Sequence, residues 1–171
     1  MTLISMPRGS SKKAFLAALN KVLKNKAAYE ALYESELKKL SDTTVLESQR
    51  AQAEEALQDA LESLQEIIRE NTQYKQDQTA YLAKYNAQKD VVNEKKQLLK
   101  AAKKAIIEQT AKKEKLRRFM NALALCDDEA TEFQDEVFTL AINRILVEKG
   151  EKVKLVFCFT DGSEITQMVA D

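Results

Sequence analysis

An unbroken stretch from Ser11 to Lys149 contains neither glycine nor proline, and this constrains the fold more than any other feature. The 171 residues hold only 3 Gly and 1 Pro, the two residue types that most often mark turns and breaks. Ala, Leu, Lys, Glu and Gln, which favour helices, dominate the stretch. The chain is therefore predicted to be mainly α-helical, with few loops.

Polar clusters predict where the first helices begin and end. Residues 1–10 are expected to form a flexible leader, and a first helix is predicted from about Ser11 to Leu40. The polar cluster at 41–44 predicts a kink or a turn. Thr44 and Glu47 have the spacing of a capping box, which would begin the second helix.

Two heptad patterns predict a helical hairpin. In the third predicted helix, from about 79 to 125, Tyr85, Val92, Leu99 and Ile106 lie seven residues apart, with Val91, Leu98 and Ala105 beside them. A polar segment at about 71–78 is predicted to be the hairpin tip. A connection this short requires the two helices to run antiparallel. In the second predicted helix, the residues expected on the seam between the two helices alternate at spacings of four and three. They are Leu46, Arg50, Ala53, Leu57, Ala60, Leu64, Ile67, Asn71 and Tyr74.

The charges are segregated between the two heptad-bearing regions. The chain has 27 basic and 27 acidic residues, so its formal net charge is zero. Residues 30–70 carry 11 acidic and 4 basic side chains, whereas residues 84–118 carry 12 basic and 4 acidic ones. Ion pairs across the seam are therefore expected along the hairpin, each contributing a few tenths of a kcal/mol when exposed. This charge split favours the hairpin over a parallel dimer in which two acidic or two basic helices would pair.

The C-terminal part, residues 127–171, is predicted to combine a short helix with a small sheet. Thr131 and Gln134 have capping-box spacing ahead of an apolar helical pattern that includes Ile142. From about Ile145, β-branched and aromatic residues predict two or three antiparallel strands. Such a sheet must dock on a helix or on another domain. The predicted helical region, residues 11–126, ends before this part begins. Val153, Leu155, Phe157 and Phe159 are expected on one face, with turns at Lys149-Gly150-Glu151 and Asp161-Gly162.

The residue inventory excludes several chemistries. The chain has no His, which removes His-based acid–base pairs and His-ligated zinc sites. Cys126 and Cys158 lack C-x-x-C spacing, so two buried reduced thiols are the favoured expectation, although a disulfide between them stays open. Asp127 and Asp128 are expected to be solvated loop residues. We therefore expect no metal site and no cofactor, and no catalytic constellation stands out, so no enzyme activity is expected of this chain. No apolar run approaches the roughly 20 residues that span a bilayer, so we expect no membrane span and a cytoplasmic location.

Two groups of side chains are candidate contact sites. Tyr74, Gln78 and Tyr81 lie at the predicted tip; Tyr is frequent at interface hot spots, but Tyr81 also fits the seam and could simply end the core. Basic side chains near the end of the third helix could touch phosphates or could pair with the acidic helix. The residues of this basic cluster are Lys112, Lys113, Arg117 and Arg118.

Several segments resemble large serine recombinases of Gram-positive bacteria and their conjugative transposons. The resemblance covers about Phe15 to Ile165 and is most specific in the C-terminal hairpin. It is carried by Glu70-Asn71, Gln76-Asp77-Gln78, Tyr81 and Tyr85, Lys115-Leu116-Arg117-Arg118-Phe119 with Leu123, Thr131-Glu132-Phe133, and the segment from Val156 to Ile165 (VFCFTDGSEI).

This resemblance implies a role in site-specific DNA recombination and integration. The chain is similar only to the C-terminal coiled coil, so a fragment or a truncated gene product is expected. The catalytic serine, the zinc ribbon and most DNA contacts would belong to domains that are not matched here. The implied role is contact with other recombinase subunits during synapsis and control of recombination direction, with a directionality factor as a further partner. The alternative is a structural coiled-coil adaptor unrelated to DNA.

Overall fold

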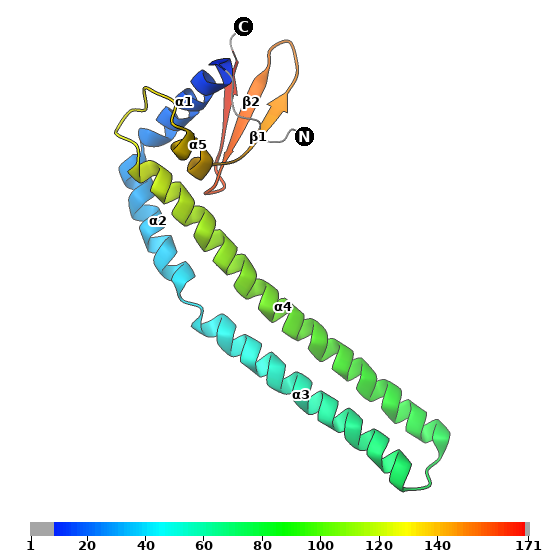
Figure 1. The fold of residues 1–171 in the computed structure, drawn as a ribbon. Helices are drawn as coiled ribbons and strands as arrows, with labels where there is room; N and C mark the ends of the chain where they lie inside the picture. The colour runs from blue at the N-terminus through cyan, green and yellow to red at the C-terminus, as the bar shows by residue number, and fades with distance from the viewer. Residues whose placement is uncertain (1–8, 170–171) are drawn as a thin grey trace. The chain divides into compact units, whose positions relative to one another are not determined.

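A computed structural model describes residues 9–169 and divides them into two compact units (Figure 1). Residues 9–41 and 111–169 form the base unit, and residues 42–110 form the hairpin unit. One helix, α4 (Gln78–Ala124), contributes residues to both units. The predicted class is confirmed: the chain is mainly α-helical, with a helical hairpin and a small C-terminal antiparallel sheet. Of the expected leader, only Gly9 and Ser10 are described, and both are already helical.

The first predicted helix is two helices, α1 (Gly9–Leu23) and α2 (Lys26–Ser41), so the prediction of one helix to Leu40 is wrong. At the break the Asn25 amide bonds to the Val22 carbonyl at 3.0 Å, which closes a tighter turn than an α-helix has. The two helices also differ in burial. One face of α1 is buried, whereas no residue of α2 is fully buried.

The capping box predicted at Thr131 is absent. Helix α5 (Asp135–Ala141) begins after Gln134, whose side chain makes no cap hydrogen bond. Asn20 of α1 instead holds the preceding loop. Its side-chain oxygen accepts from the Ala130 amide at 2.8 Å, and its nitrogen donates to the Ala130 carbonyl at 3.0 Å. This loop is therefore fixed by a contact with a distant helix, whereas the sequence suggested a hydrogen bond between neighbouring residues.

The sheet is an antiparallel meander in the order β1-β2-β3. Its strands are β1 (Ile142–Glu148), β2 (Lys154–Phe159) and β3 (Glu164–Met168). Ile142, predicted on the short helix, is instead the first residue of β1. Val153 precedes β2 and is exposed, but Leu155, Phe157 and Phe159 belong to the core as predicted. The two connections fall at the predicted turns.

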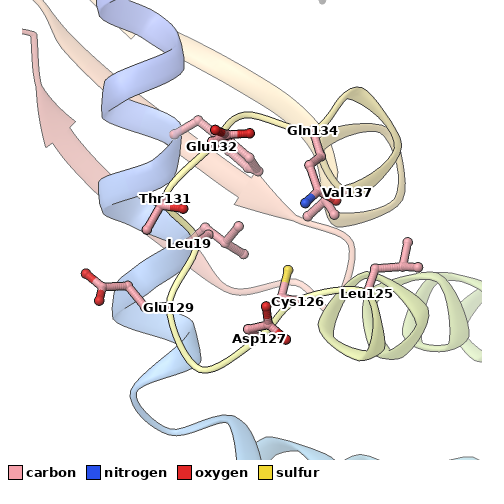
Figure 2. A pocket seen from close by; sticks show the side chains of 11 residues that line it. Leu19, Leu125, Cys126, Asp127, Glu129, Thr131, Glu132, Gln134 and Val137 are labelled. Carbon is pink, nitrogen blue, oxygen red and sulfur yellow. The ribbon is translucent and has the colours of Figure 1, made fainter.

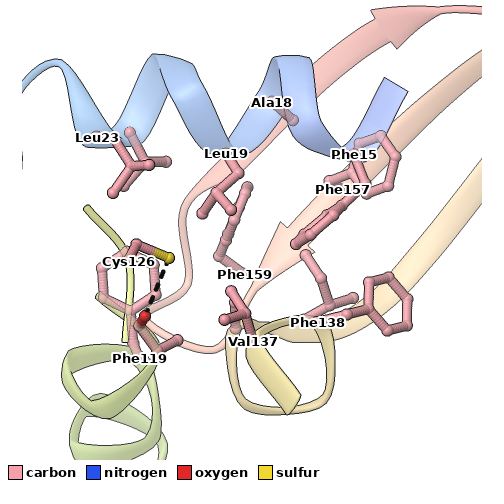
Figure 3. Packing of buried hydrophobic residues seen from close by; sticks show 14 of the residues in the cluster. Phe15, Ala18, Leu19, Leu23, Phe119, Cys126, Val137, Phe138, Phe157 and Phe159 are labelled. Atoms are coloured by element: carbon pink, nitrogen blue, oxygen red, sulfur yellow. Dashed lines mark hydrogen bonds between the residues drawn. The ribbon is translucent and has the colours of Figure 1, made fainter. Parts of the chain in front are cut away.

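An aromatic cluster forms the core of the base unit (Figure 3). The ring of Phe15 on α1 lies 5.1 Å from that of Phe138 on α5 and 5.9 Å from that of Phe157 on β2. The ring of Phe119, near the end of α4, lies 6.0 Å from that of Phe159. The sheet is thus docked on helices, which confirms the expectation that it could not stand alone.

The hairpin unit pairs α3 (Thr44–Gln73) with the first part of α4 in an antiparallel arrangement. Residues 74–77 connect the two helices, inside the predicted tip. All the predicted α3 seam positions from Leu46 to Asn71 are buried or partly buried, whereas Tyr74 is 66 % exposed. The seam on α4 comprises Tyr81, Tyr85, Gln88, Val92, Lys95, Leu99, Ala102, Ile106 and Gln109.

The start of α3 differs from its prediction. Residues 42 and 43 interrupt the helices, so the expected break is present. The side chain of Thr43 makes no cap hydrogen bond, and the Asp42 carboxylate accepts from the Thr44 amide at 3.0 Å. The prediction of a capping box formed by Thr44 and Glu47 is therefore wrong. Hydrogen bonding from Thr44 lowers the pKa of Asp42.

Candidate functional site

The hairpin tip is closed by its own polar side chains. The Asp77 carboxylate accepts from the Thr79 amide at 2.8 Å and so caps the start of α4. The Gln78 side-chain nitrogen donates to the Asn71 side-chain oxygen at 3.1 Å and to the Gln76 carbonyl at 3.3 Å. Gln78, expected to contact a partner, thus has a structural role that fixes the connection between α3 and α4.

The tyrosines at the tip have different environments. The ring of Tyr81 lies 6.0 Å from that of Tyr85, and both side chains are partly buried on the seam. Of the two alternatives for Tyr81, this geometry favours the end of the core. Tyr74 follows the last residue of α3 and is 66 % exposed. It is therefore the candidate anchor that the tip presents to solvent.

The basic cluster is largely engaged by neighbouring groups of the base unit. The Lys112 ammonium lies 3.2 Å from the Glu36 carboxylate, and the Arg117 guanidinium lies 2.8 Å from that of Glu114. Arg118 donates to the Thr139 carbonyl of α5 at 2.6 Å. Lys113 is partly buried. Three of the four side chains therefore have partners within the chain, and phosphate contact stays a prediction.

Ion pairs across the hairpin are fewer than the charge split suggested. Within residues 42–110, all of which the structure describes, one ion pair joins α3 to α4, between Glu54 and Lys103 at 3.8 Å. The other ion pairs in this range lie within a single helix, such as Arg69 with Glu66 and Arg50 with Glu47. Within the two charged segments, the other described pair of this kind is Lys112 with Glu36. The expectation of repeated pairs along the hairpin is thus wrong, and several long side chains pair with a neighbour on their own helix instead.

Glutamine side chains of α4 reach across the seam instead, one to α3 and one to the break between α2 and α3. Gln88 donates to the Ala60 carbonyl of α3 at 2.9 Å, and Gln109 donates to the Asp42 carbonyl at 3.0 Å. Ala60 is only 6 % exposed, and its small side chain leaves room for the amide of Gln88. The sequence patterns assigned no contact to Gln88 or Gln109. The position of Gln88 opposite a small residue, Ala60, is the signal that could have revealed this contact.

In the base unit, Asp161 lies at the centre of a hydrogen-bond network at the β2–β3 turn. One carboxylate oxygen accepts from the Tyr33 hydroxyl at 2.6 Å, and the other accepts from the Ser163 amide at 2.9 Å and from its hydroxyl at 2.6 Å. Gly162 has φ of +94°, a conformation that favours glycine. Burial and the contact with Asp161 raise the pKa of Tyr33. The Asp-Gly-Ser segment therefore has a structural explanation.

A small cavity of about 120 Å³ lies beside the loop that precedes α5 (Figure 2). Its walls combine apolar side chains such as Leu19 and Val137 with the polar groups of Asp127, Glu129 and Thr131. Cys126 also lines it, and burial raises the pKa of this thiol. Both cysteines are buried and free, as expected. The cavity has the volume of a few water molecules, at about 30 Å³ each.

The described part of the chain offers no assembled metal centre and no membrane span. No group of three or more Cys, Asp or Glu side chains within residues 9–169 is placed to hold a metal ion. No helix in the same range is long and apolar enough to cross a bilayer. Comparison of the chain with models of protein families, with curated proteins and with solved structures finds no match. The recombinase resemblance therefore rests on the sequence segments that carry it.

Proposed function

We propose that this chain is a coiled-coil interaction module of a site-specific serine recombinase, in which the hairpin tip contacts another subunit. The observation that carries the proposal is the exposed Tyr74 at the closed end of a helical hairpin. In the recombinases that the chain resembles, such a module holds subunits together in synapsis and influences the direction of recombination. It would act in the cytoplasm, with DNA contacted mainly by domains outside this chain.

Three further features support this role. The Asp77 cap and the Gln78 hydrogen bonds hold the tip in one conformation, and a preorganised contact loses less entropy on binding. A tyrosine ring gives a large contact area at low conformational cost. The small sheet, built around the segment from Val156 to Ile165, lies where the resemblance implies a C-terminal hairpin.

A structural adaptor unrelated to DNA is the second candidate. The contacts of Lys112, Arg117 and Arg118 within the base unit favour it, because they give this basic cluster a role without nucleic acid. The gene neighbourhood separates the two candidates: an adjacent coding region for a resolvase-like catalytic domain supports the recombinase module, and its absence supports the adaptor.

Site-specific cross-linking tests the tip contact directly. We expect the Tyr74→Cys chain to form disulfide-linked dimers under mild oxidation, since both native cysteines are buried and should react slowly. The matched control is Ser48→Cys, an exposed position on α3 far in sequence from the tip. Equal cross-linking of the two variants, or no cross-linking of the Tyr74→Cys chain, would contradict a contact through the tip.

A further inference from the structure

The hairpin unit carries two grooves on opposite sides of its seam, and their linings differ. One groove, of about 440 Å³, is lined by Leu57, Leu99 and Ile107 and by four lysines. The other, of about 490 Å³, is lined mainly by small apolar side chains, and we call it the alanine groove. Its apolar lining residues are Ala53, Ala56, Leu98, Ala101, Ala102 and Ala105.

The alanine groove and its rim have complementary shapes. Leu98 lines the groove on the α4 side and is 50 % exposed, and Val91, one heptad away on the same helix, is 37 % exposed. Leu98 thus projects beside a trough formed by the methyl groups of the alanines. A leucine beside a row of alanines is a knob next to a hole that a facing helix could fill. The same face thus carries both a projecting side chain, Leu98, and a trough that could receive such a side chain from another helix.

The charges show which occupant fits this groove. Among the described residues that line it, Lys95 is the one charged side chain, and its ammonium lies 3.8 Å from the Glu94 carboxylate. Two copies of this face can therefore meet without opposing unpaired charges. In the other groove, Lys103 pairs with Glu54 and Lys104 pairs with Glu108. Lys96 and Lys100 have no ion pair among the described residues, and each would face the same two lysines in a second copy. Like charges disfavour that pairing.

We propose that the alanine groove is the interface between two copies of this chain, related by a two-fold axis. Leu98 of each copy would enter the trough of the other, and the two hairpins would form a four-helix arrangement. The contact is isologous, because the same face is used on both sides. The proposal rests on the proposed function only in taking another copy as the partner, and it uses a different surface from the tip.

Sedimentation equilibrium of the full chain tests this interface with a matched pair of variants. Leu98→Glu buries a carboxylate in the trough, and we expect it to weaken dimerisation by at least about tenfold. Ile107→Glu makes the same kind of change on the same helix, at a residue that is 68 % exposed in the lysine-lined groove. We expect this control to dimerise like the parent. Circular dichroism checks that both variants stay helical.

Each other outcome contradicts the interface. It is wrong if the parent stays monomeric, if Leu98→Glu dimerises as tightly as the parent, or if Ile107→Glu weakens dimerisation equally. Failure here is separable from failure of the tip contact, because Leu98→Glu leaves Tyr74 unchanged. A Tyr74→Cys cross-link that persists in the Leu98→Glu chain would show that the tip associates without the alanine groove.

Discussion

At the scale of single residues, Asp161 does more than make a turn. Its two carboxylate oxygens hold Ser163 within the turn and Tyr33 on α2, so one side chain ties the β2–β3 hairpin to a distant helix. The most distinctive segment of the sequence is therefore explained by packing of the base unit. This contact has no local sequence signal, since Tyr33 and Asp161 are 128 residues apart.

The contact between Tyr33 and Asp161 predicts a loss of stability in alkaline solution. Burial and the neighbouring carboxylate raise the Tyr33 pKa above its ordinary value, so the folded state favours the protonated phenol. This contribution is fully present below about pH 10, the pKa of an unfolded tyrosine, and is lost as the pH rises beyond it. Urea unfolding between pH 8 and pH 11 should show the loss. In Tyr33→Phe, which removes the titrating group, this part of the pH dependence should disappear; an unchanged profile would contradict the assignment.

At the scale of helices, polar side chains set the register of the hairpin. Gln88 and Gln109 each reach a backbone carbonyl at the far side of the seam, while Glu54 and Lys103 provide the cross-helix ion pair. A glutamine amide at a seam position can satisfy one specific carbonyl, whereas leucines would tolerate a shifted pairing. The two helices are thus aligned by hydrogen bonds as well as by the apolar heptads.

Removal of one of these amides should destabilise the hairpin. Gln88→Ala loses the bond to the Ala60 carbonyl, and we expect it to lower the free energy of unfolding by about 1 kcal/mol. Gln97→Ala makes the same substitution at an exposed position of α4 and should change it by less than about 0.5 kcal/mol. Urea unfolding followed by circular dichroism measures both. Equal effects of the two variants would show that Gln88 does not hold the register.

Helix boundaries show which part of each element could be predicted. The extent of α4 follows from its propensity and heptads, and it begins and ends within about two residues of its prediction. The break between α1 and α2 has no Gly or Pro to mark it. It arises because α1 buries one face among the core aromatics, and this tertiary constraint is invisible to local patterns. The start of α5 was missed for the same reason, since Asn20 holds the loop before it.

At the scale of the whole molecule, the fold class could be predicted because long helices need only local information. Composition, heptads and the polar tip together required an antiparallel hairpin, and the alternation around Phe157 required strands. Contacts that depend on the tertiary fold could not be predicted. Sequence patterns placed Val91 and Leu98 beside the heptad seam, but only the structure shows that both are exposed and that Leu98 lines a groove.

Self-association through the hairpin unit is the property on which the proposed role of this chain depends. The most direct test is the sedimentation of the purified chain over a wide range of concentrations. We expect the average mass to rise from that of one chain toward that of two or more as the concentration increases. The mass of a single chain at every concentration would contradict self-association.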